Sequence, residues 1–196
     1  MTATDLEKLV RAELTKTGLW QLVDLHKSQF LEFPDGLFAE LVLTDGSKQV
    51  DVERIGRDLR ESVKKQNVEL DLIVRSVWTV KTIGDPPYGS QTGRWRIPVT
   101  ITSGVAMQAV EVDVLYEVVL DIKRRIAERG LDKNSAVQAE TSAVKEIVKE
   151  FVEMELSLGG ESYWDPVQHC RREINGSALA YLFMHTPVAQ HLGIDG

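Results

Sequence analysis

Carboxylate pairs are the first groups in this sequence that could do chemistry. Glu111 and Asp113 stand two residues apart in a strand-like run, and Glu69 and Asp71 have the same spacing. Carboxylates gathered on neighbouring strands can bind a divalent metal for hydrolysis, as in nucleases. A restriction-type site would also need a lysine two residues after the acid, and Asp113 occupies that position after Glu111.

Arginines on the preceding strand offer these acids a structural role instead. A turn at 103–104 would join two antiparallel strands and set Arg94 opposite Asp113. The same register sets Arg96 opposite Glu111, and the alternate positions on both strands are apolar. Opposite charges then meet on one face and apolar side chains on the other. We therefore predict cross-strand ion pairs and no metal site.

Histidine and thiol groups near the C-terminus form the next cluster, which comprises His169, Cys170, His185 and His191. Their spacing matches no metal-binding template, although helices could bring them together. They could also supply a Cys–His nucleophile pair. Chance explains the cluster more simply, so we predict that Cys170 is a buried apolar side chain and not a catalytic one.

The loop 84–93 is the most unusual segment, because it is long for a hairpin and rich in glycine and proline. It exposes Tyr88, and Arg94, Trp95 and Arg96 follow directly. Long loops on rigid strands often carry function. These four residues are our candidates for binding a small anionic ligand.

Cofactor-binding and nucleophile motifs are absent from the sequence. It contains no GxGxxG, GxxxxGK[ST], GxSxG or HExxH, the patterns that bind phosphates, present a serine or hold zinc. We therefore predict no catalytic residue, no metal and no cofactor.

The acidic net charge of -7 disfavours nucleic acids and anionic membranes as partners. Residues 51–129 have the element order of a double-stranded-RNA-binding domain, but the turn that would meet phosphates carries Glu117 and Asp121. A single cysteine permits no intrachain disulfide, and residues 1–9 contain no apolar run typical of a signal peptide. We expect a soluble protein of the cytoplasm.

Helical periodicity at both ends and strand-like alternation between them predict the elements that position these groups. We expect helices over 5–18, 19–30, 51–66, 115–130, 135–158 and 165–186, and strands over 37–44, 70–80, 94–102 and 110–114. Ser135 should cap the helix that it begins, and residues 175–177 should interrupt the last helix. Clustered strands flanked by helices are typical of an α+β fold. We predict a three- to four-stranded, mainly antiparallel meander packed by helices, with an N-terminal helical pair and a C-terminal helical layer. We expect one domain over 1–196, with its core in 37–130 and the helical layer in 131–196.

The run 178–184 is apolar on every side if it is helical, which places it in the core or against a partner. Leu179, Leu182 and Phe183 are our candidates for such an interface. Abundant apolar helix without catalytic motifs favours a non-catalytic protein–protein interaction or assembly module, an adaptor, chaperone or immunity-like protein that forms a homodimer. The alternatives are a small metal-dependent hydrolase or nuclease that uses acidic or histidine residues, and a domain that binds a small anionic ligand.

Overall fold

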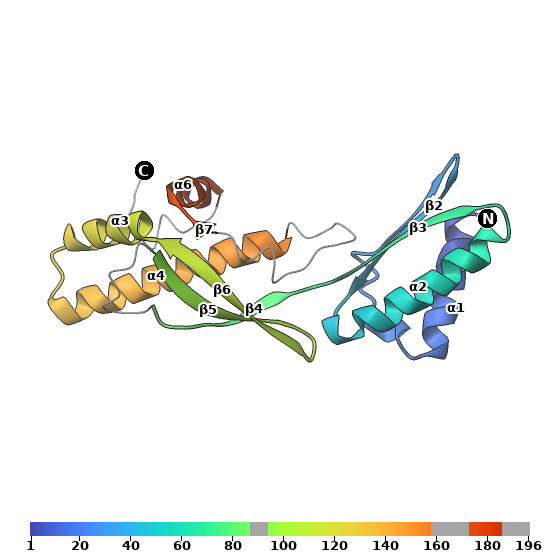
Figure 1. Cartoon of the computed structure of the whole chain (residues 1–196), viewed down its shortest axis with the longest axis horizontal. Coiled ribbons are helices and arrows are strands. Elements are labelled where there is room, and N and C mark those ends of the chain that lie inside the picture. The colour runs from blue at the N-terminus through green and yellow to red at the C-terminus, as the bar shows by residue number, and fades with distance from the viewer. Residues whose placement is uncertain (87–93, 158–172, 186–196) are drawn as a thin grey trace. The chain divides into compact units, whose positions relative to one another are not determined.

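The computed structural model describes residues 1–86, 94–157 and 173–185 (Figure 1). Helices and two β-sheets make up these ranges, which confirms the α+β class. The contacts divide the chain into two compact units. Of the described residues, the first unit holds 1–78 and 102–106, and the second holds the rest. The expected single domain stays a prediction.

The first unit folds as a three-stranded sheet with two helices. In chain order its elements are α1 (Ala3–Lys16), the 3-10 helix η1 (Trp20–Leu22), β1 (Gln29–Phe33), β2 (Gly36–Leu43), the 3-10 helix η2 (Gly46–Lys48), α2 (Gln49–Lys64) and β3 (Glu69–Ser76). The strand order is β1-β2-β3. β1 pairs antiparallel with β2, and β3 pairs parallel with β2 after the α2 crossover.

Both helices of the first unit pack on one face of this sheet. Alternate residues of β2 and β3 are buried there with the apolar stripes of α1 and α2, namely Leu37, Ala39, Leu41, Leu70, Leu72, Val74, Leu6, Val10, Leu14, Val52, Leu59 and Val63. Gly56 allows α2 to lie close to β3, because a Cβ atom there would stand 2.4 Å from the side chain of Leu72. No helix of the first unit covers the opposite face with comparable packing.

The second unit packs helices against another sheet. Its described elements are β4 (Thr79–Ile83), β5 (Arg94–Ser103), β6 (Ala106–Leu115), α3 (Tyr116–Ala127), α4 (Lys133–Ser157), β7 (Glu173–Ile174) and α6 (Gly176–His185), and its strand order is β4-β5-β6-β7. The tip of the β5–β6 hairpin groups with the first unit. The predicted alternation is confirmed, since Trp95 and Ile97 of β5 and Val112 of β6 are buried while Arg96 is exposed. None of the described helices combines the length and apolarity needed to cross a membrane.

The helix expected over 19–30 is wrong. The chain forms η1 there and then β1, because its backbone pairs with β2. The N–H of Thr44 donates to the carbonyl of Leu22 at 2.9 Å, and the N–H of Asp24 donates to the carbonyl of Val42 at 2.7 Å. The Asp24 side chain accepts a hydrogen bond from the N–H of His26, which closes a local turn in place of a helix.

The single strand expected over 70–80 is also wrong. It is two strands in two sheets, β3 beside β2 and β4 beside β5. The chain leaves the first sheet at Val77, whose N–H donates to the carbonyl of Leu43 at 2.8 Å. Apolar and polar residues keep alternating across the break between β3 and β4, so the alternation could not reveal that break.

Three local details differ from expectation. The turn between β5 and β6 is 104–105, one residue later than predicted. Asp132, not Ser135, caps α4, and hydrogen bonds from Ser135 lower the pKa of its carboxyl. Asn175 starts a helix rather than interrupting one, because its side chain accepts from the backbone of Ser177 and Ala178.

Leu182→Ala tests whether α6 anchors the second unit. Leu182 is 0% exposed, so the substitution should lower the free energy of unfolding by about 2–5 kcal/mol. Met184 on the same helix is 74% exposed, so Met184→Ala should change that free energy by less than about 0.5 kcal/mol. Urea unfolding measures both, and equal effects would show that α6 is not part of the core.

Candidate functional site

Arg94 and Arg96 form the ion pairs predicted from the sequence. Arg94 Nη1 lies 3.1 Å from Asp113 Oδ2, and Arg96 Nη1 lies 3.7 Å from Glu111 Oε2. Arg96 Nε also lies 3.2 Å from Asp113 Oδ1. The acids of β6 are therefore neutralised by the neighbouring strand.

Trp95 lies on the opposite face of β5 from these arginines and is 2% exposed. The Lys123 ammonium lies 5.3 Å from the centre of its ring, within range of a cation–π interaction. The structure therefore does not bring Trp95 together with Arg94 and Arg96 around one ligand. Tyr88 lies outside the described residues.

The other sequence candidates are placed only in part. Leu179 and Leu182 are buried within the chain, and nothing is described for the side chain of Phe183. The cluster of His169, Cys170 and His191, with the side chain of His185, lies outside the described residues. Glu69 and Asp71 belong to β3, in a different sheet from Glu111 and Asp113. Across the described ranges, no three His, Cys, Asp or Glu side chains are grouped to hold a metal ion.

A cavity of about 380 Å³ lies between α3 and α6, lined by Glu117, Asp121 and Arg125 among others. Glu117 Oε1 accepts the N–H of Gly176 at 2.9 Å, which ties α3 to the start of α6. Burial opposes ionisation of Asp121, but hydrogen bonds from Arg125 and Arg124 outweigh it and lower the pKa of this carboxyl. Glu117 thus links the two helices and Asp121 is paired within α3, so both carboxylates already have structural partners.

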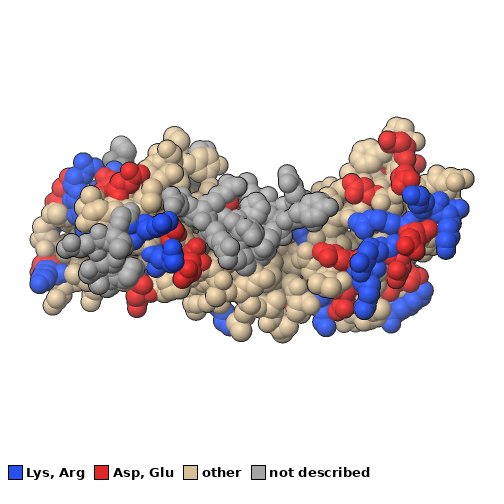
Figure 2. Space-filling model, viewed as in Figure 1, with Lys and Arg blue, Asp and Glu red and all other residues tan. Residues whose placement is uncertain are grey.

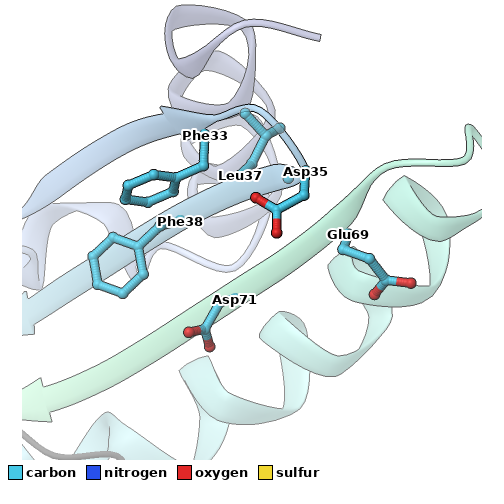
Figure 3. Close-up of a pocket in the computed structure, with 7 residues that line it drawn as sticks. Phe33, Asp35, Leu37, Phe38, Glu69 and Asp71 are labelled. Carbon is cyan, nitrogen blue, oxygen red and sulfur yellow. The ribbon is translucent and has the colours of Figure 1, made fainter.

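The helix-free face of the first sheet is the surface that stands out. Leu31 and Phe33 of β1 are 42% and 51% exposed. Phe38 of β2 pairs with Leu31, and Figure 3 shows the rings of Phe33 and Phe38 on the same side of the sheet. We call the surface formed by Leu31, Phe33, Phe38 and Ile73 the open face. Phe38 and Ile73 are half-buried, and a patch of exposed and half-buried apolar side chains is typical of interaction sites.

Carboxylates border the open face. Asp35 in the β1–β2 turn, with Glu69 and Asp71 of β3, lines a cavity of about 190 Å³ beside the two phenylalanine rings (Figure 3). None of these three acids forms an ion pair with a described residue, whereas Glu40 lies 2.6 Å from Arg75 on the same sheet. Over α1 and α2, by contrast, Lys and Arg are intermixed with Asp and Glu (Figure 2). The open face is therefore apolar with a negative rim.

A tight turn brings these groups together. Residues 34 and 35 form a two-residue connection, because Phe33 pairs with Gly36. Gly36 is required by the close approach of β3, since a Cβ atom there would lie 2.8 Å from the carbonyl oxygen of Glu69. The turn thus places Asp35 beside the start of β3.

The two edges of this sheet differ in how their backbone is satisfied. Arg60 of α2 donates to the carbonyl of Leu72, and Gln49 donates to that of Val74 at 3.4 Å, so α2 side chains bond to two carbonyls of the β3 edge. No described strand or side chain bonds to the outer backbone of β1. An uncovered edge strand is a template for another strand.

Sequence reasoning missed this site because the helix expected over 19–30 removed β1 from the sheet. The signal was present as a Pro34-Asp35-Gly36 turn between two runs rich in Phe and Leu. Such a turn between apolar runs is typical of a hairpin.

Comparison with protein-family models, with curated proteins and with solved structures gives no match to this chain. Its function must therefore be argued from its own surfaces.

Arg96→Ala tests the structural role of the arginine pairs. Arg96 is 57% exposed at its side chain, so the substitution should lower the free energy of unfolding by only about 0.2–1 kcal/mol. Added salt should reduce the difference in unfolding free energy between the native chain and Arg96→Ala, because salt screens exposed charges. Urea unfolding at two salt concentrations measures this, and a large, salt-independent loss would contradict it.

Proposed function

We propose that this chain is a non-catalytic protein-binding module of the adaptor, chaperone or immunity type, and that it acts in the cytoplasm. Its docking surface in this proposal is the open face of the first sheet. One observation carries the proposal: Phe33 and Leu31 are exposed, next to Phe38, on a sheet face that no helix of the first unit covers. The single cysteine supports a reducing compartment.

The energetics favour a protein partner. Burying a Phe or Leu side chain is worth about 1.5–3 kcal/mol. A partner that covers the open face would gain this from several side chains at once, with aromatic residues at the centre. The carboxylate rim of Asp35, Glu69 and Asp71 favours a partner that carries Lys or Arg at its periphery.

The alternative functions find less support on this surface. An anionic ligand would be repelled by the rim acids, and Arg94 and Arg96 are already paired with acids of β6. A hydrolytic metal centre needs grouped ligands, and the described residues provide no such group. Self-association is compatible with the proposal, because a second copy is also a protein partner.

Phe33→Asp tests the proposal by affinity capture from an extract of the cells that make the protein. The charge should abolish capture of any partner that docks on the open face, because a carboxylate would be buried without a counter-charge. Val50→Asp is the matched control, since Val50 is 73% exposed at the start of α2, a helix that packs on the opposite face.

Quantitative mass spectrometry compares the captured proteins, and thermal melting confirms that both variants fold. Proteins lost with Phe33→Asp but retained with Val50→Asp would support the proposal. Identical profiles for the native chain and both variants would contradict it.

A further inference from the structure

We propose that β1 pairs antiparallel with β1 of a second copy of this chain, about a two-fold axis at Leu31, so that the two sheets become continuous. This inference goes beyond the proposed function, which concerns the face of the sheet and not its edge. It rests on the backbone of β1, on the order of its side chains and on the charges at its two ends.

Successive residues of β1 direct their backbone N–H and C=O groups to opposite sides of the strand. Because Phe33 and Gly36 close the two-residue turn, they form a hydrogen-bonded pair, and so do Leu31 with Phe38. The N–H and C=O groups of Phe30 and Glu32 therefore point away from β2. They have no partner among the described residues.

A two-fold axis at Leu31 satisfies these groups. It places Phe30 opposite Glu32 of the second copy and Glu32 opposite Phe30 of the second copy. The backbone N–H and C=O groups of both residues point outward, so Phe30 and Glu32 of opposite copies exchange two backbone hydrogen bonds. Leu31 meets Leu31 of the second copy as a non-hydrogen-bonded pair, where side chains come closest. The exposed leucines would then bury each other.

The two neighbouring registers, with the axis at Glu32 or at Phe30, are less favourable. An axis at Glu32 sets two carboxylates directly opposite each other, which is destabilising. An axis at Phe30 loses the contact between the leucines. The outward backbone groups and the side chains of β1 therefore favour the same register, with the two-fold axis at Leu31.

The charges at the two ends of β1 are complementary. Lys27 lies just before the strand and Asp35 just after it, and both are exposed. In an antiparallel pair the start of one strand meets the end of the other, so Lys27 faces Asp35 of the second copy at each end. Within the described ranges, the ion pair of Lys27 is a long contact of 3.8 Å with Asp24, which it can exchange.

The edge that pairs in the dimer is the edge that the described chain leaves uncovered. This favours a second copy of the chain, over an arbitrary extended segment, as the partner of β1. After pairing, the sheet would end on both sides at β3, where Arg60 and Gln49 bond to the carbonyls of Leu72 and Val74. Dimerisation would thus pair the two β1 edges, for which the described residues supply no backbone partner. It would also join the two open faces along the leucine pair.

Light scattering coupled to size exclusion, across a wide range of concentrations, tests this inference first. The native chain should be a dimer that dissociates on dilution. Glu32→Pro should abolish the dimer, because it removes an outward N–H while leaving the bonds between β1 and β2 intact. Glu32→Thr keeps the N–H and should remain dimeric. A native chain that is monomeric at every concentration would overturn the inference.

Disulfide trapping then locates the interface. In a Cys170→Ser background, Leu31→Cys should oxidise to a covalent dimer, because non-hydrogen-bonded pairs bring Cα atoms to about 4.5 Å, within the range of about 4.4–6.8 Å for disulfides. Val50→Cys in the same background should not. A dimer that persists with Glu32→Pro and fails to cross-link at residue 31 would also overturn the inference.

The trapping result is independent of the proposed function. If Glu32→Pro is monomeric and still captures the partners that Phe33→Asp loses, both proposals stand. If the capture experiment fails while Leu31→Cys cross-links, only the binding proposal falls.

Discussion

Backbone groups at the edge of a β-sheet need hydrogen-bond partners, and the two edges of the first sheet differ in the partners that the described residues supply. At the β3 edge, α2 supplies Arg60 and Gln49 to the outward carbonyls. At the β1 edge, the outward groups of Phe30 and Glu32 have no partner within the described chain. An uncovered edge strand is a template for aggregation unless something pairs with it. This asymmetry links the fold to the interactions that we propose.

The faces of the same sheet repeat the asymmetry. Because α1 and α2 both pack on one face, their apolar stripes and the alternate residues of β2 and β3 form the core of the unit. The opposite face keeps Leu31 and Phe33 exposed, and the rim acids Asp35, Glu69 and Asp71 form no ion pair with a described residue, unlike Glu40, which pairs with Arg75. A partner protein that buries these side chains would gain hydrophobic free energy, because the isolated unit leaves them in contact with water.

Local patterns predicted the second unit better than the first. The alternation of β5 and β6 fixed which side chains are buried, and the pairing of Arg94 with Asp113 followed from opposite charges on one face. The first sheet depends on pairing between distant segments. Helical spacing over 19–30 could not show that Leu22 and Asp24 would bond to β2 instead. The open face was lost with that strand, because a site on a sheet edge exists only once the strand order is known.

Amide hydrogen exchange of β1 measures the open edge most directly. In dilute solution, the amides of Leu31 and Phe33 should be protected, because they bond to β2, and those of Phe30 and Glu32 should exchange as fast as unstructured amides. At high protein concentration, Phe30 and Glu32 should become protected while Leu31 and Phe33 change little. Protection of Phe30 and Glu32 already in the dilute monomer would contradict the account, because it would mean that the chain covers this edge by itself.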